Sequence, residues 1–191
     1  MDHGTIMDGW IVPVVGDTAV GKTAITLQFA WNYFVDESYR RQLMVDNRRC
    51  FIEPMDGEGM DLDEFLRDLW PRKAKGVILL YSIVSRSTFN RLEEIRKLVI
   101  TKDEGAIFIL VGNKCDSATG REVSIEEGAA MARQFGCQFV EASAKTAQNV
   151  ELVFATLIRA LRQTRGDTIG TSSTHAEPTQ LRKRKNRCII L

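Results

Sequence analysis

The sequence contains little of what marks secreted, membrane-spanning or zinc-binding proteins. No apolar run approaches the length of a membrane-spanning helix. The N-terminus lacks the basic and then apolar segments of a secretory signal. Four cysteines occur among 191 residues, and their spacing fits neither a zinc site nor a dense disulfide framework. We find no internal repeat, and we expect a protein of a reducing, cytosolic compartment.

Charge of one sign is not in excess either, because 26 basic residues nearly balance 25 acidic ones. The domain as a whole lacks the basic character of nucleic-acid-binding proteins, so we expect no nucleic-acid partner. Hydrophobic residues make up 44% of the chain, which is enough for one compact domain. We expect an N-terminal extension over 1–9, a domain over 10–165, a flexible basic tail over 166–187 and a short motif at 188–191.

Apolar runs alternate with amphipathic segments along the domain, which is typical of an α/β fold with a mainly parallel sheet. Strands are expected at 10–15, 39–46, 49–55, 76–83, 106–112 and 138–142. Helices are expected at 22–33, from a Ser87 cap to about 100, between Ser124 and Gly136, and at 149–165. Asp46 and Asn47 predict a tight turn, and Ser124 with Glu127 has the spacing of a capping box.

Residues 16–23 are Gly-Asp-Thr-Ala-Val-Gly-Lys-Thr and match the phosphate-loop pattern G-x-x-x-x-G-K-[ST]. The pattern lies between an expected strand and an expected helix, as a phosphate loop requires. Glycines allow the backbone N–H groups to face an anion, and the helix N-terminus adds partial positive charge. Lys22 can reach the outer phosphates, and the Thr23 hydroxyl can hold Mg²⁺. A chance match should occur in roughly 1% of chains of this size, so we predict phosphate binding here.

Three further segments follow expected strands at their carboxyl ends. Asp56–Gly59 has the form D-x-x-G, Asn113–Asp116 has the form N-K-x-D, and Ser143–Lys145 is Ser-Ala-Lys. Doubly wound sheets bind their ligands at this edge. Each segment alone is also compatible with an ordinary turn or strand end. Together with the phosphate loop, in this order and spacing, they resemble the Ras family of small GTPases over about residues 10–165.

The resemblance implies a P-loop GTPase fold: an α/β fold with a mainly parallel six-stranded sheet, one antiparallel strand and helices on both faces. It implies a monomer that binds GDP, GTP and Mg²⁺, hydrolyses GTP, and carries signals with an exchange factor and effector proteins. The N-K-x-D segment argues against a P-loop kinase or ATPase. In the family its Asp accepts from the ring N–H and the amino group of guanine, a pair that adenine lacks.

By the resemblance, Asp116 accepts these two N–H groups, Asn113 ties the loops together and Lys114 packs along the base. Ala144 offers its backbone N–H to the guanine oxygen, and Phe34 stacks across the base edge. The other implied nucleotide-binding residues are Asp17, Thr18, Ala19, Val20, Gly21, Lys22, Thr23, Ala24, Val35, Asp36, Gly59, Ser143 and Lys145. The implied metal-binding residues are Thr23 and Asp56, and the implied catalytic residues are Lys22, Gly59 and Met60.

One segment and several single positions depart from the family. Within residues 34–41, Phe-Val-Asp-Glu runs directly into Ser-Tyr-Arg-Arg, so the Thr with which the family binds Mg²⁺ and senses the γ-phosphate is missing. Met60 stands where the family has the Gln that orients the attacking water, which a thioether cannot do. Thr18 replaces a Gly that leaves room for a helper protein's arginine. Pro13 and Pro54 fall inside expected strands, where each removes a backbone donor.

These departures predict slow GTP hydrolysis in a chain that retains its contacts to the base and the β-phosphate. Two alternatives stay open at this point. A wrongly placed splice junction would explain the short segment, but it would not explain Met60 or Thr18. A pseudo-GTPase, meaning a membrane-tethered module that holds nucleotide without switching, would also lack the Thr that senses the γ-phosphate.

The last ten residues are strongly basic and end in a lipidation motif. Cys-Ile-Ile-Leu at 188–191 has the C-a-a-X form, and the final Leu favours geranylgeranylation of Cys188. The basic residues before it are Arg182, Lys183, Arg184, Lys185 and Arg187. One lipid chain anchors weakly, so basic residues at an anionic surface supply the second signal. The competing interpretations of the basic run are a solvated tail or a nuclear-localisation patch. Beside the motif, the run predicts anchoring to the cytoplasmic face of the plasma membrane.

Overall fold

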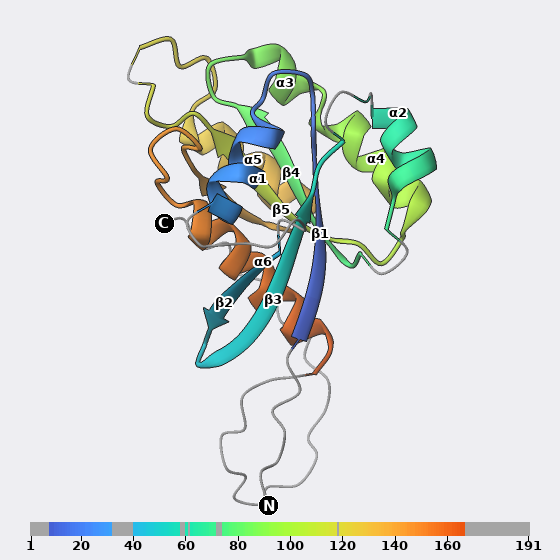
Figure 1. The fold of residues 1–191 in the computed structure, drawn as a ribbon. Coiled ribbons are helices and arrows are strands. Elements are labelled where there is room, and N and C mark those ends of the chain that lie inside the picture. Colours follow the sequence, from blue (N-terminus) through green and yellow to red (C-terminus); the bar gives the residue numbers. More distant parts are fainter. Residues whose placement is uncertain are drawn as a thin grey trace, which may run out of the picture.

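A computed structural model describes residues 8–31, 40–57, 60, 62–71, 74–117 and 119–166. Its centre is a six-stranded sheet in the order β2-β3-β1-β4-β5-β6 (Figure 1). The strands are β1 (Asp8–Gly16), β2 (Arg41–Val45), β3 (Arg48–Met55), β4 (Gly76–Ser82), β5 (Ile107–Asn113) and β6 (Gln138–Glu141). β2 is antiparallel to β3, and the other neighbouring strands are parallel. The predicted α/β fold with one antiparallel strand is confirmed.

The burial of β4 and β2 follows from their sequences. All residues of β4 are buried, because this central strand carries a continuous apolar run between two layers of helices. In β2, at the edge of the sheet, Leu43 and Val45 are buried, whereas Met44 between them is 54% exposed. β2 joins β3 through Asp46 and Asn47, which have φ angles of 50° and 59°. Positive φ at both positions is what a two-residue hairpin turn needs, so the predicted turn is confirmed.

Helices cover both faces of the sheet (Figure 1). They are α1 (Lys22–Trp31), α2 (Leu62–Glu64), the π-helical segment η1 (Phe65–Leu69), α3 (Arg86–Asn90), α4 (Leu92–Lys102), α5 (Ile125–Phe135) and α6 (Val150–Thr164). On one face α1 packs on α6, where the rings of Phe29 and Phe154 stack with centroids 3.8 Å apart. On the other face η1, α3, α4 and α5 enclose a second core around Tyr81 and Phe89. Among the described residues, no helix combines the length and apolar composition needed to cross a membrane.

The helical region after β4 begins differently from the prediction. Ser85, with an extended backbone, precedes α3, and no side-chain hydrogen bond caps it. Ser87 lies inside the first turn, so the predicted Ser87 cap is wrong. Thr88 makes the local connection instead: its hydroxyl donates to the Ser85 carbonyl at 2.8 Å and accepts from the last N–H of β4 at 3.1 Å. The helix is interrupted at Arg91, after which α4 begins.

The capping box at the start of α5 is confirmed. The Glu127 N–H donates to the Ser124 hydroxyl at 3.2 Å, and the Ser124 N–H donates to the Glu127 carboxylate at 2.8 Å. Gly136 ends the helix with a φ of 70°, a conformation that glycine adopts without strain. Residues 32–33 of the first predicted helix, the extension up to residue 7 and the tail after 166 lie outside the described residues.

Pro13 and Pro54 lie within neighbouring strands of the sheet, as the sequence predicts. Val12 is opposite Pro54, and Pro13 is opposite Met55, in the parallel pairing of β1 with β3. β1 pairs with β3 as far as Pro13 and with β4 from Val14 onward. Pro13 therefore lies where β1 changes partner, which limits the effect of its missing N–H on the ladder.

Candidate nucleotide-binding site

The phosphate-loop segment connects the end of β1 to the start of α1, and close packing explains its two motif glycines. A Cβ on Gly16 would lie 2.2 Å from the carbonyl oxygen of Leu80 in the neighbouring strand. A Cβ on Gly21 would lie 2.4 Å from the side-chain nitrogen of Asn113, and the φ of Gly21 is 98°. Only glycine fits both positions, so the loop can turn sharply while it contacts the segment after β5.

Lys22, the first residue of α1, reaches back across the loop. Its ammonium group donates to the carbonyl oxygens of Gly16 and Asp17 at 3.1 Å and 3.0 Å. Burial lowers the pKa of Lys22, and the nearby carboxylates of Asp56 and Asp17 act in the opposite direction. Burial disfavours the charged form of this lysine, and a nearby anion would stabilise that form. The position therefore suits a phosphate group.

Asn113, at the end of β5, joins the phosphate loop to the segment after β6. Its side-chain N–H donates to the carbonyl of Val20 at 2.8 Å, and its side-chain oxygen accepts from the Ala144 N–H at 3.1 Å. The side chain is buried and both of its polar ends are paired. Lys114 adds a second connection, because its ammonium group donates to the carbonyl of Ala19 at 2.9 Å. Three segments distant in sequence are thereby held together at one edge of the sheet.

The carboxylate of Asp116 is held by the segment after β6. The Ser143 hydroxyl donates to Asp116 Oδ1 at 2.6 Å, and it accepts from the Thr146 N–H at 3.1 Å. The hydrogen bond from Ser143 is the main cause that lowers the pKa of Asp116, and the charge of Lys145 acts in the same direction. Asp116 is therefore ionised near neutral pH and is an acceptor only, suited to a ligand that offers adjacent N–H groups.

Asp56, directly after β3, has a buried carboxylate oxygen that lacks a hydrogen-bond partner among the described residues. A buried, unpaired carboxylate oxygen is costly unless a cation or a donor approaches it. Thr23, in the first turn of α1, adds a half-buried hydroxyl. Oxygen ligands of this kind fit Mg²⁺, which usually takes only one or two protein ligands beside phosphates and waters. The described residues hold no cluster of three acidic, Cys or His side chains that would form a complete metal cage.

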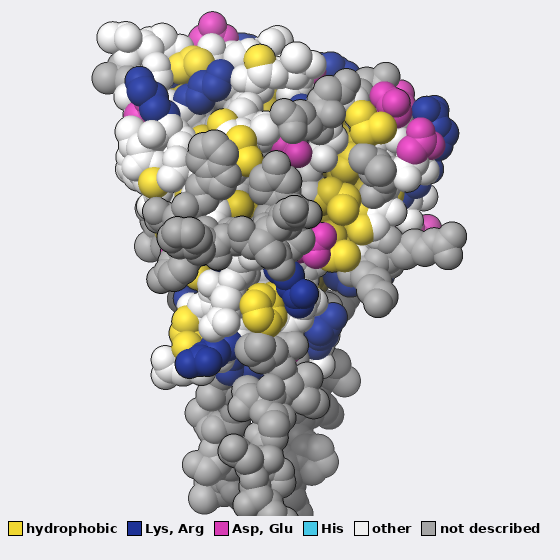
Figure 2. Space-filling view, viewed as in Figure 1, with side chains coloured by type: hydrophobic (Ala, Val, Ile, Leu, Met, Phe, Trp, Pro, Cys, Tyr) yellow, Lys and Arg dark blue, Asp and Glu magenta, His cyan; other side chains and the backbone are white. Residues whose placement is uncertain are grey.

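Met60 lies beside the phosphate loop. Its N–H donates to the Gly57 carbonyl at 2.9 Å, and its side chain lines a small cavity together with Lys22 and Phe65. Val14, Leu62 and Phe65 contribute apolar side chains to this cavity. Figure 2 shows an apolar strip that runs beside α2. A thioether is a weak acceptor and has no donor, so Met60 offers little to hold a water molecule.

The remaining predicted site residues are either exposed or outside the described part of the chain. Thr18, Ala19 and Ala24 are exposed at the surface of the loop and the first turn of α1. Phe34, Val35, Asp36, Gly59 and Cys188 lie outside the described residues, so the predictions made for them stay predictions.

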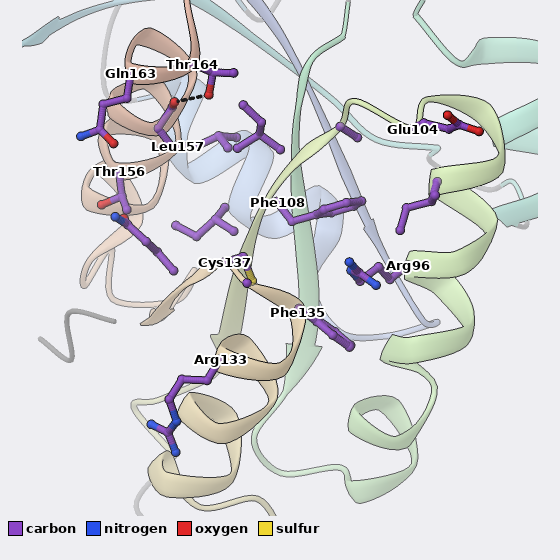
Figure 3. A pocket seen from close by; sticks show the side chains of 17 residues that line it. Arg96, Glu104, Phe108, Arg133, Phe135, Cys137, Thr156, Leu157, Gln163 and Thr164 are labelled. Atoms are coloured by element: carbon purple, nitrogen blue, oxygen red, sulfur yellow. Dashed lines mark hydrogen bonds between the residues drawn. The ribbon is translucent and has the colours of Figure 1, made fainter. Parts of the chain in front are cut away.

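A cavity of about 1000 Å³ opens at the opposite edge of the sheet (Figure 3). It lies among the starts of β5 and β6, α4, the end of α5, and α6. The Arg96 guanidinium lies over the rings of Phe108 and Phe135, at 5.6 Å and 4.9 Å from their centroids. Open α/β sheets bind ligands at the carboxyl ends of their strands, and this cavity is at the amino ends. It is therefore separate from the candidate nucleotide site.

Sequence patterns missed two contacts at the site. Arg91, between α3 and α4, donates to the Asp17 carboxylate of the phosphate loop at 2.8 Å. The Ser143 N–H donates to the carbonyl of Gln148 at 3.0 Å and closes the loop after β6. Neither contact belongs to a motif. The contact of Arg91 with Asp17 has one sequence signal: an Asp inside a phosphate loop places a negative charge where anions bind, so a nearby cation is expected.

Comparisons with known proteins agree with the geometry. The chain matches the family model described as Ras family over residues 11–163. It is 40% identical to Ras-like protein 1 of Pyricularia oryzae, over 80% of this chain and 74% of that protein. Ras-like protein B of Aspergillus fumigatus is 37% identical, over 91% of this chain and 86% of the relative. Protein ras-2 of Neurospora crassa is 38% identical, over 86% of this chain and 83% of that protein.

Proposed function

Because this chain belongs to the Ras family, it is a small GTPase that binds GDP and GTP with Mg²⁺, and we propose that it works as a lipid-anchored switch with impaired hydrolysis. Membership also implies exchange factors and effectors that act on it in signal transduction. To this family activity we add three assignments: the residues that hold the nucleotide, the cause of slow hydrolysis, and the membrane anchor. We expect the chain to act as a monomer.

We assign the guanine base to the loops after β5 and β6. The observation that carries this assignment is the bridge that Asn113 makes between the Val20 carbonyl and the Ala144 N–H. Asp116, ionised and held by Ser143, accepts from the ring N–H and the amino group of guanine. The same edge of adenine has a ring nitrogen acceptor, which a carboxylate repels. The arrangement therefore favours GDP and GTP over ATP.

We assign the phosphates to residues 16–23 and the Mg²⁺ ligands to Thr23 and Asp56. The unpaired, buried oxygen of Asp56 supports the metal assignment. Thr23 and Asp56 would hold the ion, which would supply positive charge beside the phosphates. Lys22 supplies a second positive charge from the start of α1, and its present bonds to loop carbonyls show that it reaches across the loop.

Slow hydrolysis is attributed to missing parts rather than to weak binding. Phosphoryl transfer needs an oriented water, a bridging metal and compensation of the charge on the transferred group. Met60, which lines the cavity beside Lys22, provides no donor for a water. Thr18 adds a side chain where an incoming arginine of an activating protein would pass. That arginine is worth about 10³–10⁵ in rate in this class of enzyme.

Competition between nucleotides tests the base assignment. Labelled GDP on the purified chain is displaced with increasing GTP or ATP. We expect ATP to require at least a hundredfold higher concentration than GTP for the same displacement. A site that hydrogen-bonds two N–H groups of its ligand strongly rejects a base that lacks them. Equal competition by ATP would contradict the assignment. Hydrogen exchange that differs between the GDP and GTP forms supports switching, whereas identical exchange would favour the pseudo-GTPase.

We propose that the chain is anchored to the cytoplasmic face of the plasma membrane through Cys188. The C-a-a-X ending supplies the lipid, and the basic run over 182–187 supplies attraction to anionic lipid. Neither signal alone anchors firmly, because one lipid chain gives marginal and reversible binding.

Cell fractionation tests the anchor. Cys188→Ser should move the chain from membranes to the cytosol, while Cys137→Ser, a matched change of a thiol on the folded domain, should not. Neutralising the basic residues to Gln should weaken association gradually, since each contributes about 1 kcal/mol near an anionic surface. Undiminished membrane association of Cys188→Ser would refute the lipid anchor.

A further inference from the structure

Asp17 brings a carboxylate into the phosphate loop at its second position. Its Oδ1 accepts two hydrogen bonds of 2.8 Å, one from the Thr18 N–H and one from Nη1 of Arg91. The Asp17 side chain is 18% exposed and that of Arg91 is 52% exposed. The carboxylate therefore lies against the loop backbone and is partly withdrawn from water, while the arginine approaches it from outside.

The charge of Asp17 acts on the place where phosphates bind. The Lys22 ammonium donates to the carbonyl of Asp17 at 3.0 Å. The carboxylates of Asp17 and Asp56 both raise the pKa of Lys22 against the lowering effect of burial. An anion that reaches Lys22 consequently also meets the negative charge of Asp17. Like charges at short range repel one another unless a cation compensates one of them.

Arg91 supplies that cation from a different part of the fold. It lies between α3 and α4, 74 positions away from Asp17 in the sequence. Its N–H donates to the Ser87 carbonyl at 3.3 Å, and its carbonyl accepts from the Ile95 N–H at 3.1 Å. Both helices thus hold its backbone in place. Its Nε is also 3.8 Å from the Glu94 carboxylate, a longer contact than the one to Asp17.

We propose that Arg91 is a charge-compensating residue for nucleotide binding, which neutralises Asp17 so that the loop can hold a polyphosphate. Arg91 acts through Asp17 and is a positioning residue, not a catalytic one. The proposal rests on the nucleotide binding assigned above. Loss of Arg91 leaves an uncompensated carboxylate beside the phosphates, so the complex dissociates faster.

A double-mutant cycle on nucleotide dissociation tests this compensation. The release of labelled GDP in excess Mg²⁺ is measured for the wild type, Arg91→Gln, Asp17→Asn and the double variant. We expect Arg91→Gln to release GDP roughly tenfold faster, since one unit charge is left uncompensated near the surface. Asp17→Asn should release GDP more slowly than the wild type, because it removes a negative charge beside the phosphates while its amide oxygen can still accept from the Thr18 N–H. The double variant should return close to the wild-type rate.

Three controls separate compensation from a structural role. Lys97→Gln removes a charge from α4, the helix that begins directly after Arg91. Lys97 pairs with Glu93 at 2.9 Å and is 68% exposed, so this change should leave GDP release unchanged. Arg91→Lys should restore most of the wild-type rate. The effect of Arg91→Gln should shrink at high salt, because mobile ions screen a partly exposed charge.

Two results would overturn the proposal. One is an unchanged release rate in Arg91→Gln. The other is a double variant that releases GDP as fast as Arg91→Gln, which would show that the pair only anchors the loop. A wild-type chain that does not retain GDP would instead overturn the nucleotide-binding assignment together with this proposal, and the wild-type measurement identifies that case.

Discussion

The two ends of the candidate nucleotide site are built to different degrees. At the base end, Asn113, Lys114 and Ser143 each donate a hydrogen bond of 2.6–2.9 Å to another segment. At the γ-phosphate end, Asp56 has a buried oxygen without a hydrogen-bond partner in the described part of the chain, and Met60 lines a small cavity beside Lys22. At the base end the protein groups already form hydrogen bonds with one another. At the γ-phosphate end a ligand would have to pair with the oxygen of Asp56.

This difference separates binding from hydrolysis. A network that already has its geometry costs little to order when the base arrives, so it supports affinity. Hydrolysis depends on groups that act in the transition state, and Met60 cannot supply the one expected at its position. A chain can therefore keep its nucleotide while its chemistry is weak.

Removal of Lys22 from the phosphate loop should cause the largest loss of GDP affinity, because its charge acts on the phosphates between the two ends of the site. Lys22→Ala removes charge-assisted contacts worth about 1.5–3 kcal/mol each, so GDP affinity should fall on the order of a hundredfold. Calorimetric titration with GDP measures it. Lys75→Ala, which removes a surface lysine paired with Asp103, is the matched control. An unchanged affinity in Lys22→Ala would mean that the base end alone holds the nucleotide.

The base end alone should respond to a change at Asp116. Asp116→Asn replaces one acceptor by an amide N–H, which pairs with the ring carbonyl of xanthine rather than with the amino group of guanine. GDP affinity should drop roughly tenfold or more, and xanthosine diphosphate should bind better than to the wild type. Competition between the two diphosphates reports the preference. If Asp116→Asn and the exposed-site control Asp68→Asn both keep the guanine preference, the base lies elsewhere.

The γ-phosphate end should respond to Met60 in rate and not in affinity. Met60→Gln introduces an amide that can orient water. We expect hydrolysis to rise about tenfold or less, because we propose that Thr18 and the short segment at 34–41 impair the same step. GDP affinity should not change. Met44→Gln, at an exposed position of β2, is the control for a Met-to-Gln change in general. A Met60→Gln variant with wild-type hydrolysis would locate the defect elsewhere.

The smallest effect is expected from the group that supports Asp116. Ser143→Ala removes the hydrogen bond that lowers the pKa of Asp116, so the carboxylate of the variant takes up a proton at higher pH than that of the wild type. GDP affinity should fall a few-fold at neutral pH and decline sooner on acidification, as the pH approaches the ordinary Asp pKa of about 3.9. Titrations at several pH values compare the variant with Ser85→Ala. Parallel pH profiles would show that Ser143 does not support the ionised form of Asp116.

Local chemistry explains which parts of the fold could be predicted from the sequence. The turn at Asp46 and Asn47 and the capping box of Ser124 and Glu127 depend on residues a few positions apart, and both are confirmed. The position of the Ser87 cap was wrong, because Thr88 forms the bonds that fix the start of α3. Neither Ser85 nor Ser87 caps α3 through its side chain, so a serine near an expected helix start does not by itself fix where the helix begins.

Contacts between distant segments explain what could not be predicted at the site. Motif spacing places the phosphate loop and the N-K-x-D segment at the same sheet edge, and the resemblance implied that Asn113 ties the loops together. Neither reveals that the bond goes to the carbonyl of Val20. The pair of Arg91 with Asp17 has no local pattern at all, since the two residues are 74 positions apart. The π-helical segment η1 also carries no sequence signal that we recognised.

Single-turnover hydrolysis of preloaded GTP measures the γ-phosphate end alone, in a complex that the base end has already formed. The wild-type chain is loaded with GTP, freed of excess nucleotide, and followed for phosphate release with and without a Ras-type activating protein. We predict a complex that retains its nucleotide, releases phosphate very slowly and gains little from the activating protein. Hydrolysis at the rate of an ordinary Ras-type protein, with strong acceleration by the activating protein, would show that the γ-phosphate end is not impaired.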